Sequence, residues 1–320
     1  MSYVIGADGG GTKTDLILCD TQGHVLERVL LGGSNPNDIG LNRAAVCLLE
    51  GIGRLAPAMR PGAPATAFFG ISGGMAGRNR ERLRQVLAEK LDPGIRFETH
   101  SDVINVLNCG TDGRDGGVLI AGTGMIACLR KGAQLFRAGG YGYLLDRGGS
   151  GYDFGRDALY HTLCVMDGLE PPSLLAGLVE EKTGGLFRNL DDIYAGGRAR
   201  IASFAPLVFA AYAQGDSTAA GIIRRGAQET AKLLNRLAVL SGQAVCEVVL
   251  AGSVFRNFSV LEPFLTPHLR HRFKFIFPAV DPVYGAALEA ARLNPGIDQQ
   301  VFQQNLKQEM EDSKWTACLK

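Results

Sequence analysis

The stretch "IGADGGGTKTD", residues 5–15, decides the fold because it joins two strand-like runs through a glycine turn. The run before it, Tyr3–Ala7, is mostly apolar, and the run after it, "DLILCD", has the composition of a buried strand. Three glycines between two such runs predict a β-hairpin. Asp8 stands directly before the glycines, although a carboxylate repels the phosphate groups that glycine loops usually bind.

The two common phosphate-binding motifs do not match this turn. A Walker A loop needs a lysine directly after its last glycine, and here Thr12 separates Gly11 from Lys13. A dinucleotide fingerprint opens a helix, whereas a strand follows here. The remaining interpretation is a turn whose backbone N–H groups and Thr12 hydroxyl hold phosphate oxygens, with Asp8 acting through Mg²⁺. The alternative is a structural hairpin turn that Asp8 caps.

The same pattern returns later in the chain. Three strand-like runs with a small-residue turn after the first occur near residues 3–31 and again near 117–138. The second turn, "AGTG", places Gly122, Thr123 and Gly124 where the first has its glycines. We interpret this as an internal structural duplication, in which two hairpins clamp a polyphosphate. Taken alone, the second turn is an ordinary β-turn.

The remaining segments predict an α/β protein of two lobes. Beyond residue 150 the apolar spacing predicts helices near residues 151–165, 173–182, 199–213 and 217–241. We expect an N-terminal lobe at 1–115, a C-terminal lobe at 116–295, and a helix at about 296–320 that can pack back on the first lobe. Because small-ligand sites prefer the space between such halves, a ligand cleft is expected between the lobes.

Composition excludes several classes of protein. The net charge is +1, which gives no basis for nucleic-acid or membrane-surface binding through bulk electrostatics. No apolar run approaches the ~20 residues of a membrane span, and no signal peptide is recognisable. The seven cysteines include no CxxC pair, which favours a reduced, cytoplasmic protein without structural zinc. Glycine accounts for 43 of 320 residues, about twice the usual share of ~7%, so many segments turn tightly.

Six motifs together resemble a known family. In chain order they are "DGGGTKT", "SDVINV", "IAGTGMI", "GGYGYLLDRGGSGYDFG", "LAGSV" and "VYGAALEA". This order resembles N-acetylglucosamine kinases, which are grouped with the BadF/BadG/BcrA/BcrD-type ATPases in the actin-like sugar-kinase and heat-shock-protein superfamily. The resemblance covers about residues 3–293. It implies two actin-like (ribonuclease-H-like) lobes, each with a mixed five-stranded sheet flanked by helices, closing on ATP and a sugar.

The resemblance also implies roles for the glycine motifs. The residues at the β- and γ-phosphates would be Gly10, Gly11, Thr12 and Lys13. Asp8 would lie at the metal, and the second phosphate loop would be Gly122, Thr123 and Gly124. Gly252 and Ser253 would border the adenosine, while Gly285 and Ala286 would belong to a small-residue helix at the lobe hinge.

Other matched positions imply the catalytic and sugar-binding groups. Asp102 matches the general base that accepts the proton of the attacking sugar hydroxyl. Its alternative role is to interact with the dipole of the helix that "SDVINVLNC" begins, capped at Ser101. Asn35 matches an asparagine that contacts the sugar, and its alternative is a turn residue before Pro36. The loop near the acetamido group would be Ser72, Gly73 and Gly74.

One segment departs from the family pattern. Family members commonly read "GDEGS" after the "GYG" strand, with an aspartate that binds a sugar hydroxyl, whereas this chain reads "LLDRGGSG". Arg147 occupies the aspartate position and Asp146 lies one residue early. Either the loop shifts so that Asp146 binds the sugar, or Arg147 binds an acidic group, since arginine suits a bidentate carboxylate. The remaining alternative is a surface arginine on a mobile loop.

The expected function is ATP-dependent phosphorylation of an N-acetylated amino sugar at C6, with ATP and Mg²⁺ as cofactors. N-acetylglucosamine is the first expected substrate, and N-acetylmuramic acid is the alternative that Arg147 leaves open. A second hypothesis is an ATPase that activates a 2-hydroxyacyl-CoA dehydratase or reductase. Such relatives carry a cluster-binding cysteine before the "AGTG" turn, where this chain has Ile120 and Ala121. A third hypothesis is a sugar-sensing regulator. No nucleic-acid or membrane partner is expected. The sequence leaves the oligomeric state open, with a homodimer as one alternative.

Overall fold

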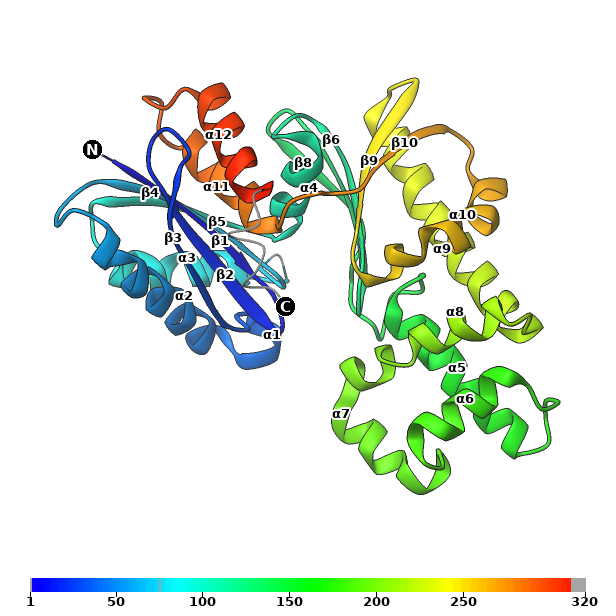
Figure 1. Ribbon diagram of the computed structural model, residues 1–320. Coiled ribbons are helices and arrows are strands. Elements are labelled where there is room, and N and C mark those ends of the chain that lie inside the picture. Colours follow the sequence, from blue (N-terminus) through cyan, green and yellow to red (C-terminus); the bar gives the residue numbers. More distant parts are fainter. Residues whose placement is uncertain (1, 75, 312–320) are drawn as a thin grey trace. The chain divides into compact units, whose positions relative to one another are not determined.

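The computed structural model describes residues 2–74 and 76–311. Contacts divide the chain into two compact units (Figure 1). The first consists of Met1–Arg114 together with Pro278–Lys320, and the second of Asp115–Phe277. Each unit is an α/β body with its own five-stranded sheet.

The sheet of the first unit has the strand order β3-β2-β1-β4-β5. Its strands are β1 (Tyr3–Gly9), β2 (Lys13–Cys19), β3 (Val25–Gly32), β4 (Ala65–Ile71) and β5 (Ile95–His100). The three strands β1, β2 and β3 form an antiparallel meander, and β4 and β5 continue the sheet in parallel with β1. Consequently β1, β3, β4 and β5 all point their carboxyl ends at the same sheet edge, where β2 begins.

Helices cover both faces of this sheet (Figure 1). One face carries α2 (Leu41–Leu55) and α3 (Asn79–Lys90), and the other carries α4 (Val103–Thr111), α11 (Pro282–Arg292) and α12 (Gln299–Glu311). Two short helical segments complete the unit: α1 (Pro36–Ile39) and the 3-10 turn η1 (Ala56–Ala58).

The second unit repeats the sheet in the order β10-β9-β6-β7-β8. Its strands are β6 (Gly116–Ala121), β7 (Met125–Lys131), β8 (Gln134–Gly139), β9 (Val245–Ala251) and β10 (Arg272–Ile276). Here too the first three strands form an antiparallel meander, and the last two are parallel to the first. The duplication that the sequence predicts is therefore confirmed, and so is the fold class of two mixed five-stranded sheets.

The second unit carries a longer set of helices. They are α5 (Gly151–Met166), α6 (Leu174–Thr183), α7 (Leu190–Ala202), α8 (Ala205–Ala213), α9 (Ser217–Ser241) and α10 (Phe258–Leu265), with 3-10 turns η2 (Phe187–Asn189), η3 (Ser253–Asn257) and η4 (Thr266–His268). The prediction of a single helix over 199–213 is wrong. The chain breaks between α7 and α8, where Pro206 in the first turn of α8 lacks the N–H that would continue the preceding helix.

The structure also corrects the predicted lobe boundary. The sequence predicts that residues up to 295 belong to the second lobe, but α11 packs on β1 and α4 of the first unit. Glycines allow this close packing: a Cβ on Gly6 would lie 2.5 Å from the backbone nitrogen of Ala287. Sequence position alone does not reveal which sheet a helix covers. The helix expected over 296–320 is α12, which packs on α11, and residues 312–320 lie outside the described residues.

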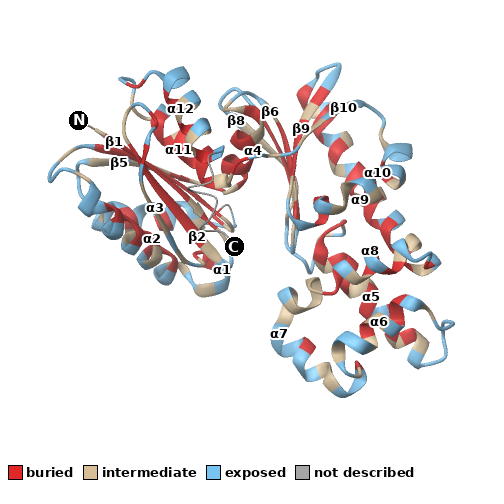
Figure 2. Cartoon of the chain, in the orientation of Figure 1, coloured by how far each residue is buried: buried red, intermediate tan, exposed pale blue. Residues whose placement is uncertain are grey.

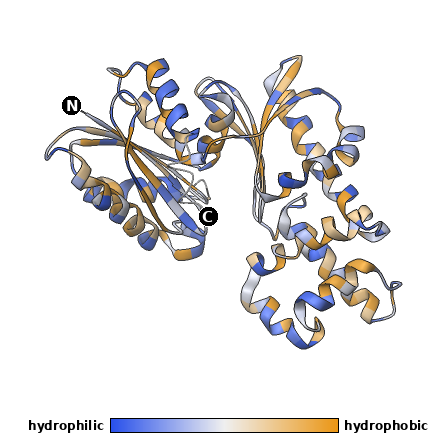
Figure 3. Ribbon diagram, in the orientation of Figure 1, coloured by the Kyte–Doolittle hydropathy of each residue, from blue (hydrophilic) through white to orange (hydrophobic). Residues whose placement is uncertain are grey.

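Each unit has its own hydrophobic core beneath its helices (Figure 2). In the first unit the buried side chains come from the central strands and from the inner face of α2, which carries apolar residues on one side and polar residues on the other (Figure 3). No helix within residues 2–74 and 76–311 combines the length and the hydropathy that crossing a bilayer requires. Each sheet positions the loops that follow its strands.

Candidate functional site

The glycine hairpin between β1 and β2 leaves donors available in the first unit. The turn is held by the Gly10 N–H, which donates to the Lys13 carbonyl at 2.8 Å. Gly11 and Thr12 are exposed, and neither their N–H groups nor the Thr12 hydroxyl makes a hydrogen bond to any described residue. Two adjacent N–H groups and a hydroxyl at a tight turn form a site that suits phosphate oxygens.

The loops that follow β3 and β4 hold this hairpin in position through hydrogen bonds. The Ser34 N–H donates to the Gly10 carbonyl at 2.9 Å, and the Ser72 N–H donates to the Gly9 carbonyl at 2.7 Å. A Cβ on Gly33 would lie 2.2 Å from the Gly11 carbonyl oxygen, so only glycine fits there. The turn is therefore fixed by the segments that follow β3 and β4.

Asp8, the last residue but one of β1, keeps one carboxylate oxygen available. Its Oδ1 accepts a hydrogen bond from Asn105 Nδ2 at 2.7 Å, and its Oδ2 has no hydrogen-bond partner among the described residues. Burial raises the pKa of Asp8 to about 7, against the hydrogen bond from Asn105, while the charge of Asp102 raises it further and that of Lys13 lowers it. A nearby cation would therefore stabilise the ionised form of the Asp8 carboxylate.

Asp102 is the second residue after β5 and the N-cap residue of α4. Its Oδ1 accepts a hydrogen bond from the Ser101 hydroxyl at 3.0 Å, and the side chain makes no cap hydrogen bond to the helix backbone. The Ser101 hydroxyl instead accepts from the Val103 N–H at 3.3 Å. Burial raises the pKa of Asp102, opposed by hydrogen bonds from the Ser101 and Ser72 hydroxyls. The Ser101 hydroxyl therefore supplies a hydrogen bond at the helix start, and the Asp102 side chain makes no cap hydrogen bond of its own, so its carboxylate can accept a proton from a ligand.

The loop candidates for sugar binding lie together at this same sheet edge. Asn35 is 6% exposed and caps α1, because its Oδ1 accepts from the Asn37 N–H at 2.9 Å. Its Nδ2 has no partner among the described residues and can donate to a ligand. A Cβ on Gly73 would lie 2.3 Å from Asn35 Oδ1. The predicted residues Ser72, Gly73 and Gly74 follow β4 directly, and Gly73 lies against this asparagine.

The second unit gathers its own predicted residues at the equivalent edge. The Gly122 N–H donates to the Gly124 carbonyl at 2.9 Å, while Thr123 and Gly124 are exposed. Gly252, at φ +100°, lies so close that a Cβ on it would be 2.3 Å from the Ala121 carbonyl oxygen. Ser253 follows directly and is exposed. The second glycine turn and the "AGS" motif are thus neighbours.

The predicted residues of the unusual loop differ in availability. Asp146 Oδ2 accepts from the backbone N–H groups of Tyr141 and Gly142, so this carboxylate stabilises its own turn. Arg147 is exposed and has no hydrogen-bond or ion-pair partner among the described residues. Of these two side chains, the one without a partner among the described residues is therefore the arginine.

Three contributors to these loops are not among the residues that the sequence predicts. Asn105 is buried beneath Asp8, and nothing in its helical spacing distinguishes it from a core position. Asn79 Nδ2 donates to Asn37 Oδ1 at 2.9 Å and to the Gly73 carbonyl at 3.1 Å, which links α3 to the loop around Asn35. The helix α5 begins within the motif "GGYGYLLDRGGSGYDFG", and its Gly151 N–H donates to the Gly122 carbonyl at 2.7 Å. Only this last contributor had a recognisable sequence signal.

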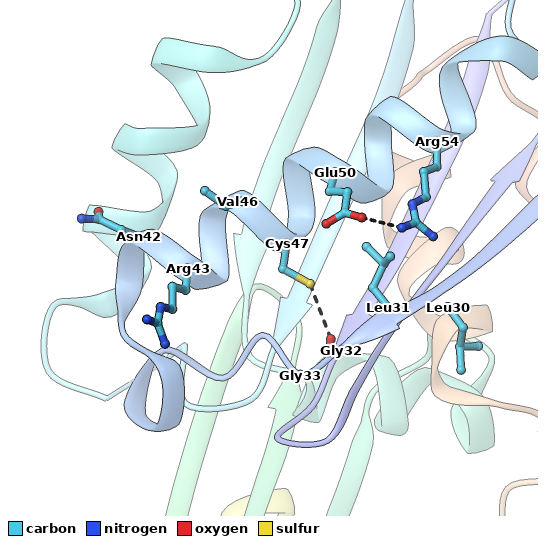
Figure 4. Close-up of a pocket in the computed structure, with 10 residues that line it drawn as sticks. All are labelled: Leu30, Leu31, Gly32, Gly33, Asn42, Arg43, Val46, Cys47, Glu50 and Arg54. Atoms are coloured by element: carbon cyan, nitrogen blue, oxygen red, sulfur yellow. Dashed lines mark hydrogen bonds and ion pairs between the residues drawn. The ribbon is translucent and has the colours of Figure 1, made fainter.

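A surface pocket of the first unit lies beside this site (Figure 4). Side chains of α2 form one wall, Leu31 of β3 points toward them, and Leu30, Gly32 and Gly33 complete the lining. The Cys47 thiol projects into the space toward the Gly32 carbonyl, at 3.5 Å. The pocket contains none of the residues that the sequence assigns to substrate, nucleotide or metal, so it is not the predicted site.

A divalent cation fits the first unit only together with a ligand. Within the described residues there is no group of three or more His, Cys, Asp or Glu side chains that could hold a metal ion. Asp8 nevertheless offers an unpartnered carboxylate oxygen beside a turn that suits phosphate. Mg²⁺ keeps several waters and is often bound through one carboxylate plus substrate phosphates, so this donor set suits Mg²⁺ with a nucleotide.

Comparison with known proteins agrees with this geometry. The model of the BadF/BadG/BcrA/BcrD ATPase family matches residues 5–290. An N-acetyl-D-glucosamine kinase of Dictyostelium discoideum is 29% identical over 89% of this chain and 97% of its own length. An N-acetylmuramic acid/N-acetylglucosamine kinase of Clostridium acetobutylicum is 28% identical over 91% of this chain and 98% of its own.

Solved structures share the fold. A candidate N-acetylglucosamine kinase of Chromobacterium violaceum is 27% identical, with a TM-score of 0.72 over 90% of this chain and 98% of its own. A ROK family glucokinase of Streptomyces griseus is 15% identical with a TM-score of 0.56, over 91% of this chain and 98% of its own, which indicates a common fold alone. The predicted actin-like fold of the two units is therefore confirmed.

Proposed function

The chain belongs to the BadF/BadG/BcrA/BcrD ATPase family, and on this basis we propose that it is an ATP-dependent kinase that phosphorylates the C6 hydroxyl of N-acetylglucosamine. The observation that carries the proposal is Asp102. Its carboxylate has a raised pKa, is not used to cap its helix, and lies at the sheet edge that also presents the glycine hairpin. The names of the relatives supply the substrate class.

In the proposed reaction the sugar oxygen attacks the γ-phosphorus, the bond from that phosphorus to the β,γ-bridging oxygen breaks, and ADP leaves. The hydroxyl proton passes to an oxygen of Asp102, whose raised pKa makes it a stronger base than an exposed aspartate. Asn35 would donate its free Nδ2 to a sugar hydroxyl, and the Ser72–Gly74 loop would lie at the acetamido group. Positioning supplies most of the catalysis in such transfers.

The glycine loops would bind the nucleotide. Gly10, Gly11, Thr12 and Lys13 offer donors and a positive charge to the phosphates, and Asp8 would hold Mg²⁺ through water. The cation would neutralise charge on the phosphate oxygens. In the second unit, the turn Gly122–Gly124 would hold phosphate, and Gly252 and Ser253 would border the adenosine.

A second candidate substrate is N-acetylmuramic acid. Exposed Arg147 has no partner among the described residues, so its guanidinium is available to the carboxylate of an acidic amino sugar. One relative is named for activity on both sugars. If Arg147 reads this group, Arg147→Ala should raise the KM for N-acetylmuramic acid at least tenfold and leave that for N-acetylglucosamine unchanged.

One assay tests the proposal. ATP consumption and product formation are measured against N-acetylglucosamine, N-acetylmuramic acid, N-acetylmannosamine, glucosamine and glucose, and the phosphorylated position is read by NMR. Phosphorylation of an N-acetylated sugar at C6 supports the proposal, and phosphorylation of none of the five contradicts it. A brown, iron-containing protein would instead favour the dehydratase-activating ATPase, although Cys128, the cysteine nearest the "AGTG" turn, is buried in β7.

A further inference from the structure

Asn105 is a buried polar residue one helical turn after Asp102. Its side chain has no solvent exposure, and its Nδ2 donates to Asp8 Oδ1 at 2.7 Å. The same nitrogen reaches the Gly70 carbonyl at 3.2 Å, and Gly70 pairs with Asp8 in the register of β1 and β4. One amide therefore binds a strand-end carboxylate and the neighbouring strand at the same level.

The surroundings fit this asparagine closely. A Cβ on Gly70 would lie 2.1 Å from Asn105 Oδ1, and a Cβ on Gly285 of α11 would lie 2.0 Å from the Asn105 backbone oxygen. Both neighbours must be glycine for the asparagine to sit where it does. Asn105 Oδ1 is buried and has no hydrogen-bond partner among the described residues, a cost that a purely structural residue such as leucine would not carry.

We propose that Asn105 is a positioning residue that fixes the Asp8 carboxylate so that its free Oδ2 faces the metal–nucleotide complex. This inference rests on the proposed kinase function. The Asn105 amide is the hydrogen-bond partner of the Asp8 carboxylate within the described residues, so its loss leaves that carboxylate free to rotate. Because Asp102 is the N-cap residue of α4 and Asn105 lies in the first turn of that helix, one helix positions both the base and the partner of the metal carboxylate.

The chain offers a matched control on the same helix. Asn108 is also fully buried, and its Nδ2 donates to the Gly285 carbonyl at 3.1 Å and to Glu289 Oε1 at 2.8 Å, not to Asp8. Asn105→Ala and Asn108→Ala each remove a buried amide from α4. Both should lower the melting temperature, but only the first should alter metal binding.

The direct test measures Mn²⁺ affinity in the presence of ADP by electron paramagnetic resonance, with no sugar present. Residues that orient metal-binding groups typically contribute 10- to 100-fold in metal affinity. We expect Mn²⁺ binding to weaken about tenfold or more in Asn105→Ala, and less than twofold in Asn108→Ala. The Mg²⁺ concentration for half-maximal activity should shift in parallel. Equal Mn²⁺ affinity in the two variants would overturn the proposal.

A double-mutant cycle separates positioning from a general structural effect. If Asn105 acts through Asp8, Asn105→Ala should cause no further loss of Mn²⁺ affinity in an Asp8→Asn background. A full additional loss would contradict the proposal. The cycle also leaves the kinase proposal separate, because a wild-type protein that binds Mn²⁺·ADP but phosphorylates no sugar refutes the function alone.

A wild-type measurement covers the case in which Asn105→Ala does not fold. In protein labelled with ¹⁵N-asparagine, Mn²⁺·ADP should broaden the side-chain amide signal of Asn105 more strongly than that of Asn108, because the first contacts Asp8. Equal broadening of the two signals would place Asp8 away from the metal and overturn the proposal.

Discussion

Replacing Asp102 with asparagine separates the chemistry of the proposed site from its stability. The substitution keeps the shape of the side chain and the oxygen that accepts from the Ser101 hydroxyl at 3.0 Å. It removes only the charge and the ability to accept a proton. The structure therefore predicts opposite effects on turnover and on thermal stability.

The loss in turnover follows from the role of a general base, which typically contributes 10²- to 10⁴-fold. At 1.36 kcal/mol per tenfold change in rate, this corresponds to about 2.7–5.4 kcal/mol of activation free energy. The KM values for sugar and ATP should change little, because the isosteric amide still fills the site.

Stability should change in the other direction. Burial raises the pKa of Asp102 in the folded state, so ionisation of this group costs folding free energy at neutral pH. A raised carboxylate pKa favours the folded state below the unfolded-state pKa and loses that contribution as the pH rises through the folded-state value. Asp102→Asn should therefore melt at the same or a higher temperature than wild type at pH 7.5, and this advantage should disappear near pH 4.

Steady-state kinetics and calorimetry at the two pH values check both signs. Asp112→Asn serves as a control for the charge change, since Asp112 lies at the other end of α4 and accepts from the Tyr284 hydroxyl at 2.8 Å. The control should keep wild-type turnover. Near wild-type turnover in Asp102→Asn would refute the base assignment, and a large fall in its melting temperature at pH 7.5 would refute the electrostatic reasoning.

Three further substitutions test other parts of the structure. Thr12→Val removes a hydroxyl that has no partner among the described residues of the chain. Because a hydrogen bond to a charged group contributes about 1.5–3 kcal/mol, the KM for ATP should rise about tenfold or more. Unchanged ATP kinetics would exclude that contact. Arg28→Met leaves Asp15 and Asp281 without the cation that binds them at 2.6 and 2.8 Å, and urea titration should show a loss of about 3–5 kcal/mol; a loss below 1 kcal/mol would contradict this. Burial, with the Arg80 charge, lowers the pKa of His100 to about 4. The unfolding free energy should therefore fall as the pH drops from 6.5 to 4, and His100→Gln should reduce that fall. An identical pH profile of stability in the variant would refute the assignment.

Much of the fold can be predicted from short segments of the sequence. The hairpin after β1, the repeated three-strand pattern and the helix ranges depend on residues that are close in the chain. The apolar runs and glycine turns fix where strands end, and the carboxyl ends of parallel strands then gather Asp8, Ser72 and Asp102 at one edge. The motif order was also sufficient to identify the family.

Contacts between segments that are distant in the chain could not be predicted from the sequence in this way. Asn105 gave no signal, because its role depends on Asp8, Gly70 and Gly285, which lie far from it in sequence. Asp146 looked like a ligand by its position, yet its carboxylate binds the backbone of its own turn. Hydrogen-bond partners are set by where a loop folds back, which residue type alone does not specify.

By itself, the sequence determined the two α/β units, the glycine turns and the residue types available for phosphoryl transfer, because strand and turn preferences act over a few neighbouring residues. Only the tertiary structure assigned α11 to the first sheet, since that choice depends on whether Gly6 of β1 leaves space for the backbone at Ala287. Only the tertiary structure, too, joined Asn105 to Asp8. Close packing and buried hydrogen bonds are long-range properties, and they decide which of the available residues can act together.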